Sequence, residues 1–292
     1  MVDASLEEED ALPFWSRTFC GYHERFVQPF TLSVSGKTVT VRQAPCASNG
    51  HAQEASSTSD GMCTGSTVWD AGIVLASCLL ETSLLSTALG RDSVSKCLEL
   101  GAGTGLAGIA AAATGKFSYV RMTDLATVVP LVQQNIELNR KEFPRQAAVE
   151  ASSLRWDSEI DLQNASQQGP FDVILGSDLL YRWPVIEPLL KALTSLAGKH
   201  TVVLLAASVG HSPETVREFC TRAGKHFRVK RLPASMQCQQ YSSTEVQLLK
   251  LTCKAGARCR GRHRILKTLP GKEQNRRLCS IKNFLTAKPL RR

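Results

Sequence analysis

Residues 98–105 read Leu-Glu-Leu-Gly-Ala-Gly-Thr-Gly and combine a strand end, an acidic residue and three glycines at alternate positions. Glycine lets the backbone approach a bound molecule closely, and the start of the helix that follows offers unpaired N–H groups. The dinucleotide fingerprint G-x-G-x-x-G requires a glycine at residue 106, where this chain has Leu106. The run therefore predicts a nucleotide-like cofactor other than a dinucleotide.

An acidic residue, Asp124, ends the strand predicted at residues 118–123. In a mononucleotide half-site a carboxylate at this position accepts the ribose hydroxyls, and its spacing from Gly101 fits that role. Asp124 is also placed to cap a helix that starts near Leu125. The two roles are compatible, and the upstream glycines favour the ribose role.

A second polar pair, Asp178 and Tyr181, follows the strand predicted at residues 171–176, in the run Ser-Asp-Leu-Leu-Tyr. If the chain turns into a helix there, the two side chains face one cleft. Together they are suited to hold an ammonium ion, the carboxylate by charge and the ring by cation–π attraction. A helix cap and a core tyrosine are the alternative, and spacing alone does not separate the two.

Two tryptophans lie near these polar groups in the predicted order of elements. Trp69 precedes the first long helix, where it is placed to close the cofactor cleft from above. Trp156 follows the strand predicted at residues 147–154, where an aromatic side chain is able to flank an adenine ring. On position alone, simple packing remains the alternative for both.

The elements that must position these residues alternate between strand and helix signals. The expected elements are a hairpin at 30–43, helices at 68–89, 106–114, 128–140, 185–196 and 213–223, strands at 94–100, 118–123, 147–154, 171–176 and 201–207, and a closing antiparallel pair at 226–232 and 243–252. Continuous apolar runs are typical of buried parallel strands. This alternation predicts an α/β fold with a doubly wound sheet and a ligand at the carboxyl ends of its strands.

The positive charge of the chain is concentrated in residues 254–292, which hold 13 basic residues and one acid. Residues 1–253 carry 22 basic and 25 acidic residues, so the pI of about 9.1 belongs to the tail. Any inference to nucleic acid is therefore confined to that tail. Because its only aromatic residue is Phe284, base stacking would lack platforms, and a solvated extension is favoured.

Composition also bounds the cellular setting. The ten cysteines form no C-x-x-C pair, so we expect no metal site and buried thiols in a reducing compartment. The acidic start of the chain is unlike a secretory or transit signal, and the longest apolar stretch, 71–80, is too short to cross a bilayer. We expect a cytoplasmic protein, also compatible with the nucleus, with a flexible segment at 1–24, one domain at 25–253 and a flexible basic tail at 254–292.

The motifs occur together in a definite order: Val-Trp-Asp-Ala at 68–71, Glu-Leu-Gly-Ala-Gly-Thr-Gly-Leu at 99–106, Thr-Asp-Leu at 123–125, Leu-Arg-Trp at 154–156 and Asp-Leu-Leu-Tyr at 178–181. This set resembles the methyltransferase family 16 enzymes, which are S-adenosylmethionine-dependent protein-lysine methyltransferases with a D-x-x-Y motif. The resemblance covers roughly residues 25–253. The glycine run alone is moderately specific, and its combination with the other motifs is highly specific.

The resemblance implies a Rossmann-like, mostly parallel seven-stranded sheet with an antiparallel last strand. It implies S-adenosylmethionine as cofactor and a monomer that acts on a protein substrate such as a molecular chaperone. Asp178 and Tyr181 would border the lysine channel as catalytic residues. The implied cofactor-binding residues are Trp69, Glu99, Gly101, Ala102, Gly103, Gly105, Asp124, Leu125, Trp156 and Ser177. The sequence departs from the pattern after the strand at 201–207, where relatives often carry an aromatic or basic residue, so the substrate stays undetermined.

The reaction implied is direct displacement at the methyl group of a sulfonium by a lysine amine. The amine must be deprotonated, because its pKa in water is about 10.4. Desolvation and the nearby sulfonium charge lower that pKa, so no dedicated base is assigned. Three alternatives remain open: a nucleic-acid or small-molecule methyltransferase, a non-catalytic cofactor-binding module, and a dehydrogenase, which Leu106 disfavours.

Overall fold

The computed structural model describes residues 29–44, 64–90 and 95–254. The chain divides into two units, residues 1–262 and 263–292, and every described residue belongs to the first. The predictions of flexible segments at 1–24 and 254–292 concern residues that lie almost entirely outside the described part.

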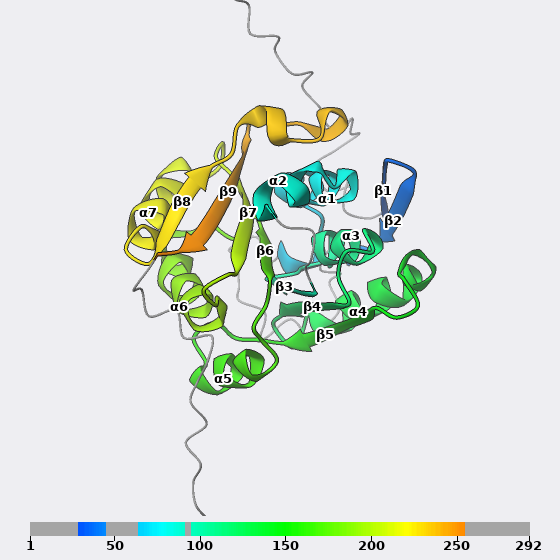
Figure 1. The fold of residues 1–292 in the computed structure, drawn as a ribbon, viewed down its shortest axis with the longest axis horizontal. Coiled ribbons are helices and arrows are strands. Elements are labelled where there is room, and N and C mark those ends of the chain that lie inside the picture. The colour runs from blue at the N-terminus through cyan, green and yellow to red at the C-terminus, as the bar shows by residue number, and fades with distance from the viewer. Residues whose placement is uncertain (1–28, 45–63, 91–94, 255–292) are drawn as a thin grey trace, which may run out of the picture. The chain divides into compact units, whose positions relative to one another are not determined.

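A seven-stranded sheet forms the centre of the domain, in the order β5-β4-β3-β6-β7-β9-β8 (Figure 1). Its strands are β3 (Lys96–Leu100), β4 (Tyr119–Asp124), β5 (Ala148–Ser153), β6 (Val173–Ser177), β7 (Val202–Ser208), β8 (Phe227–Arg231) and β9 (Val246–Cys253). All neighbours from β5 to β7 pair in parallel, whereas β9 is antiparallel to both β7 and β8. The predicted seven-stranded, mostly parallel sheet with an antiparallel last strand is therefore confirmed.

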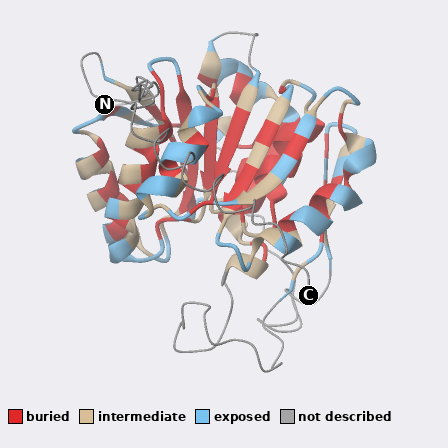
Figure 2. Cartoon of the chain, turned by 90° about the horizontal axis from the view of Figure 1, so that it is seen from below, coloured by how far each residue is buried: buried red, intermediate tan, exposed pale blue. Residues whose placement is uncertain are grey.

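Helices cover both faces of this sheet, because successive side chains of each strand point to opposite sides. One apolar layer includes Val173 and Leu175 and packs against the first group of helices, while Ile174 belongs to the opposite layer. The first group comprises α1 (Asp70–Glu81), α2 (Ser83–Leu89), α3 (Leu106–Ala113) and α4 (Val129–Leu138), and the second comprises α5 (Glu159–Gln167), α6 (Ile186–Leu196) and α7 (Pro213–Ala223). Figure 2 shows the buried strands between these two helical layers.

The prediction of one long helix at 68–89 is wrong in one respect, because the structure has two helices there, α1 and α2. Thr82 adopts a left-handed conformation with φ of 66°, and its N–H donates to the carbonyl of Leu79, 3.0 Å away. The two helices meet at a bend of 83°. The break carries no glycine or proline, so the apolar periodicity continues through it and conceals it.

Helix α5 was not predicted at all. Its sequence is polar, and only Leu162 and Ala165 are buried. A signal for its start does exist, because Ser158 precedes the helix and its hydroxyl accepts the N–H of Asp161 at 3.2 Å. The Ser-x-x-Asp spacing is that of a capping box, which outweighs the weak apolar pattern.

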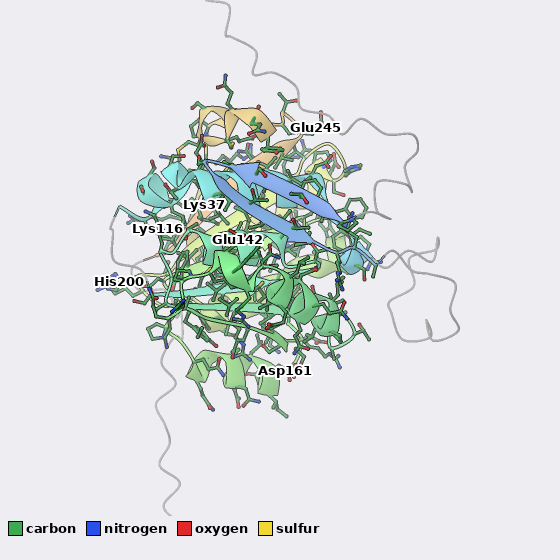
Figure 3. All side chains as sticks on the ribbon, turned by 90° about the vertical axis from the view of Figure 1, so that its right-hand side faces the viewer. Lys37, Lys116, Glu142, Asp161, His200 and Glu245 are labelled. Carbon is green, nitrogen blue, oxygen red and sulfur yellow. The ribbon has the colours of Figure 1, made fainter. Side chains whose placement is uncertain are left out.

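The predicted hairpin is present as β1 (Phe30–Val34) and β2 (Lys37–Val41), and it forms a separate two-stranded sheet. Two asparagines attach it to the domain: Asn135 in α4, and Asn139, which is the C-cap of that helix. Asn139 accepts the N–H of Thr40 and donates to its carbonyl, at 2.9 and 2.6 Å. Asn135 does the same for Arg42, at 2.8 and 3.0 Å, and donates to the carbonyl of Thr104 in the glycine run, at 2.9 Å. The hairpin thus supports the site from outside; Figure 3 views the molecule from this side.

Among residues 29–44, 64–90 and 95–254, no single helix is long and apolar enough to cross a membrane. The bent pair α1 and α2 passes that test by length and composition only, and residues 71–80 of α1 are all buried in the domain.

Candidate active site

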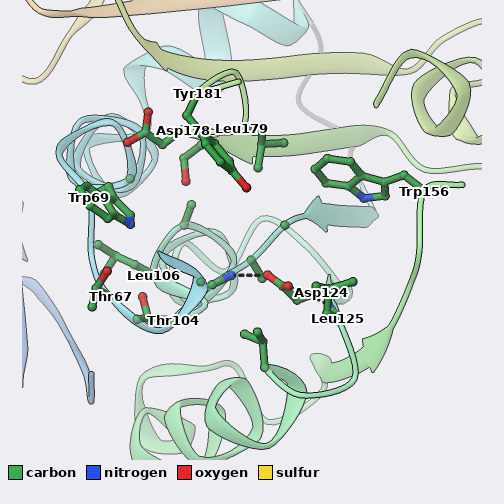
Figure 4. A pocket seen from close by; sticks show the side chains of 18 of the residues that line it. Thr67, Trp69, Thr104, Leu106, Asp124, Leu125, Trp156, Asp178, Leu179 and Tyr181 are labelled. Atoms are coloured by element: carbon green, nitrogen blue, oxygen red, sulfur yellow. Dashed lines mark hydrogen bonds between the residues drawn. The ribbon is translucent and has the colours of Figure 1, made fainter. Parts of the chain in front are cut away.

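The predicted site residues gather where β3, β4 and β6 end, which is the switch point of the sheet, because β4 and β6 flank β3 on opposite sides. A cavity of about 750 Å³ opens there (Figure 4). Ten of the twelve predicted site residues line it: Trp69, Gly101, Ala102, Gly103, Asp124, Leu125, Trp156, Ser177, Asp178 and Tyr181. Glu99 and Gly105 do not.

The glycine run forms the floor of this cavity between β3 and α3. Gly101, Gly103 and Gly105 all adopt left-handed conformations, with φ of 60°, 57° and 81°. A β-carbon on Gly103 would stand 3.1 Å from the carbonyl oxygen of Gly65, so the backbone there leaves little room for a side chain. Ala102 donates its N–H to the carbonyl of Thr123 at 3.0 Å, which holds the run against the end of β4.

The carboxylate of Asp124 lies at the same edge of the cavity. One oxygen accepts the N–H of Gly103 at 2.8 Å, and the other accepts the N–H of Leu125 at 2.7 Å. Each oxygen keeps further acceptor capacity. Burial raises the pKa of Asp124, and the two N–H donors oppose that shift. The alternative role as cap of the next helix is wrong, because α4 starts at Val129 and Val128 is its N-cap.

Glu99 lies behind the cavity wall rather than in it. The residue is 1% exposed, and its carboxylate accepts the N–H of Gly108 in α3 at 2.9 Å. Burial raises the pKa of Glu99 to about 8. Gly105 lies behind the wall too, where a β-carbon would meet Val132 and Met122. Glu99 thus links β3 to α3 through Gly108, neither residue lines the cavity, and the contact of each with a cofactor stays a prediction.

The two tryptophans lie on opposite sides of the cavity (Figure 4). Trp69 precedes α1, and its carbonyl accepts the N–H of Gly72 at 3.0 Å. Trp156 follows β5 and packs over the glycine run, since its ring carbon would be 3.3 Å from a β-carbon on Gly101. A flat ligand between the run and Trp156 would lie against an aromatic wall.

Asp178 stands at the opposite end of the cavity from Asp124 (Figure 4). Its φ of 55° is left-handed, and its N–H donates to the carbonyl of Ala206 at 2.8 Å. Burial raises the pKa of Asp178, while hydrogen bonds from Ser208 and the nearby His211 lower it. The alternative of a helix cap is wrong here too, because Val185 is the N-cap of α6.

Tyr181 is 41% exposed at the mouth of the cavity, so the alternative of a core tyrosine is wrong. The guanidinium carbon of Arg182 lies 5.3 Å from the centroid of its ring and covers one face. The hydroxyl of Ser212 donates to the Tyr181 carbonyl at 3.0 Å, which ties the motif to the start of α7. An ammonium ion would approach the other face of the ring or its hydroxyl.

Comparison with known proteins adds to this geometry. The model of methyltransferase family 16, described as lysine methyltransferase, matches residues 53–224. That is more than half of the chain. The chain belongs to this lysine methyltransferase family.

Relatives of this lysine methyltransferase agree on the type of reaction. The protein N-lysine methyltransferase METTL21A of Danio rerio is 35% identical over 163 residues, which are 56% of this chain and 68% of that protein. The protein-lysine N-methyltransferase EFM6 of Saccharomyces cerevisiae is 28% identical over 204 residues, which are 64% and 80% of the two chains. The EEF1A lysine methyltransferase 3 of Mus musculus is 33% identical over 137 residues, which are 46% and 54%. The predictions of an enzyme and of protein-lysine methylation are thereby confirmed.

Several residues that line the cavity of this lysine methyltransferase were missed by sequence reasoning. They are Gly65, Thr67, Thr104, Thr127, Arg155, Pro188 and Ser212, together with Leu179. Leu179 was visible as part of the Asp-Leu-Leu-Tyr run, where only the first and last residues carry polar groups. Pro188 lies in the first turn of α6 and Gly65 in a short 3-10 helix (Thr64–Ser66), while the rest lie in connections between elements, and their types and spacing gave no signal.

Proposed function

We propose that this protein binds S-adenosylmethionine along the glycine run and methylates a lysine that enters beside Asp178 and Tyr181. The observation that carries this proposal is the meeting of three strand ends in one cavity. Gly101 follows β3, Asp124 ends β4 and Asp178 follows β6, so the donor and acceptor groups face the same space. The family supports the reaction, and this geometry supports the roles that we propose for the residues.

The residues at the cofactor end fit that group in shape and in chemistry. Gly101 and Gly103 bring the backbone close, Asp124 offers carboxylate oxygens to the ribose hydroxyls, and Trp156 offers an aromatic face to adenine. When bound, the cofactor supplies a sulfonium-activated methyl group. The chain's own task is to align the acceptor with that methyl group and to exclude water.

The acceptor end suits a lysine amine. The Asp178 carboxylate attracts the ammonium form as it enters, and the ring of Tyr181 packs beside its alkyl chain. Removal from water favours the neutral amine, which is the form that attacks. Asp178 and Tyr181 therefore orient the nucleophile, and the fixed left-handed backbone at Asp178 sets the direction of its carboxylate.

The substrate is proposed as a cytoplasmic protein, which the enzyme methylates as a monomer. A molecular chaperone is the first candidate, and the name of the mouse relative adds translation elongation factor 1A as a second. Mass spectrometry of a labelled band in a cell lysate distinguishes the two candidates. The nucleus remains a further location to test by fractionation.

The test is transfer of tritiated methyl groups to proteins of an RNase-treated lysate. We expect one labelled band with the wild type and a loss of at least 100-fold with Asp178→Asn, because asparagine tolerates the same left-handed backbone but carries no charge. S-adenosylhomocysteine should still bind this variant within about threefold of the wild type. Cofactor binding by the wild type without any labelled protein would overturn the proposed acceptor.

A further inference from the structure

Trp183 is a large aromatic side chain that the proposed reaction does not use, and it is half exposed at 50%. It opens the short 3-10 helix at Trp183–Val185, two residues after Tyr181. Because Tyr181 lines the mouth of the cavity, Trp183 continues the surface that an incoming polypeptide must cross. Tryptophan is enriched among the residues that anchor protein interfaces, so Trp183 is a candidate for contact with a partner.

The ring of Trp183 is held in place although it is exposed. The guanidinium carbon of Arg222 in α7 lies 5.7 Å from its ring centroid. Two carboxylates fix that guanidinium in turn: Glu187 and Glu218 each accept a hydrogen bond from it at 2.6 Å. Trp183 therefore loses little side-chain freedom when a partner packs on it, which lowers the entropic cost of binding there.

Arg222 and Glu187 also form one wall of a second cavity, of about 340 Å³, between α6 and the end of α7. Its lining residues are Glu187, Leu190, Lys191, Thr194, Arg222, Lys225 and His226. Two of the three cations among them are already paired: Arg222 donates to Glu187 and to Glu218, and Lys191 lies 3.1 Å from Glu159. Lys225 therefore supplies the charge in this groove that is suited to attract an acidic side chain.

The groove and the active-site cavity are adjacent along the same helix. Glu187 lines the groove, and the next residue, Pro188, lines the active-site cavity. The hydrogen bond from Ser212 to Tyr181 holds the start of α7 against the mouth of the cavity. Trp183 connects the two, because it follows Tyr181 by two residues and its ring contacts Arg222, which lines the groove.

We propose that Trp183 and this groove dock the segment of the protein substrate that carries the acceptor lysine. An apolar side chain near that lysine packs on Trp183, and an acidic side chain further along the segment enters the groove. This inference rests on the proposed function and adds a selection rule to it. Lysines flanked by an apolar and an acidic residue are preferred over other lysines of the same protein.

The test compares full-length variants in the methyl-transfer assay, with a dialysed, RNase-treated lysate as the probe. Initial rates of labelling are measured against lysate concentration. Trp183→Ala should raise the half-saturating concentration at least fivefold, leave the plateau within twofold and leave the Kd for S-adenosylhomocysteine unchanged. Trp183→Phe should recover most of the loss. Lys225→Glu should raise half-saturation by a smaller factor, about two- to threefold, since an exposed charge contributes little.

Leu138→Ala is the matched control, because Leu138 is a 39% exposed apolar residue at the end of α4 that lines neither cavity. Rate curves for Trp183→Ala that coincide with those of this control would overturn the docking surface. A lower plateau at unchanged half-saturation would also overturn it, since that places Trp183 in the chemistry. If the wild type labels no band, the proposed function itself fails, and the inference falls with it.

Discussion

The side chain of Leu179 fills the space that a β-carbon on Gly101 would need, because its Cδ2 lies 2.5 Å from that position. Its Cδ1 blocks the corresponding position on Gly176 at 2.7 Å. The acceptor motif therefore packs directly on the cofactor run through its apolar second residue. This apolar contact gives the two halves of the site a common position.

Gly101→Ala should lower the affinity for S-adenosylhomocysteine at least tenfold. The change forces a side chain into a left-handed backbone, which costs about 1–2 kcal/mol, and into the space of Leu179. Calorimetric titration measures the binding, and thermal unfolding measures the strain.

The double variant Gly101→Ala, Leu179→Ala separates these two causes. Removing the leucine relieves the clash but leaves the backbone penalty, so the loss of stability in the double variant should be smaller than the sum of the single losses. Strictly additive losses would show that the contact between the two residues is unimportant.

Glu99 should make the protein less stable as the pH rises. Its pKa in the folded state is about 8, above the ordinary value of 4.5, so the folded protein binds more protons between those values. The free energy of unfolding therefore falls as the pH rises through that window, by up to about 3–5 kcal/mol. Urea unfolding at several pH values between 5 and 9 measures the effect.

Glu99→Gln is the control for this pH dependence, because glutamine keeps an acceptor for the N–H of Gly108 and does not ionise. The variant should show a flatter stability profile than the wild type across the same window. Parallel profiles for the two proteins would mean that Glu99 ionises normally.

Asp124→Asn should weaken binding of S-adenosylhomocysteine by about 10- to 100-fold and lower stability by about 1–2 kcal/mol, because the amide oxygen can replace only one of the two oxygens that accept the N–H groups of Gly103 and Leu125. Asparagine retains one acceptor for Gly103 but loses the charge that strengthens hydrogen bonds to the ribose hydroxyls. Asp124→Ala also removes the bond to Gly103 and should destabilise the protein as well. Wild-type affinity in the asparagine variant would remove Asp124 from the ribose site.

Asn135→Ala should destabilise the protein by about 2–4 kcal/mol, because it leaves buried backbone groups of Arg42 and Thr104 without partners. Denaturant unfolding measures this loss. Gln134→Ala changes a neighbouring exposed amide on the same helix and should have an effect within about 0.5 kcal/mol. Equal effects of the two substitutions would show that the asparagine bonds do not hold the hairpin.

The sheet and the polar site residues were predictable because they depend on local patterns. Apolar runs marked β6 and β7, and the glycine run and Asp124 follow strands at positions where ligands bind in such sheets. The break at Thr82 was not predictable, since no residue of the break is a helix breaker. The packing of Leu179 on Gly101 and the position of Glu99 behind the cavity wall both depend on tertiary packing. The residue type at a single position does not reveal them.

The asparagine pair at the C-terminal end of α4 has a consequence for how this protein can diverge during evolution. Asn135 and Asn139 form hydrogen bonds only to the main chain of the hairpin. Substitutions along β2 are therefore tolerated as long as its inward positions stay apolar. The asparagines themselves have no such freedom, because each serves a donor and an acceptor at once. The sequence of the hairpin is thus free to change while its main-chain hydrogen bonds are kept. In distant homologues, the two asparagines are therefore a better sign of the hairpin than its own sequence.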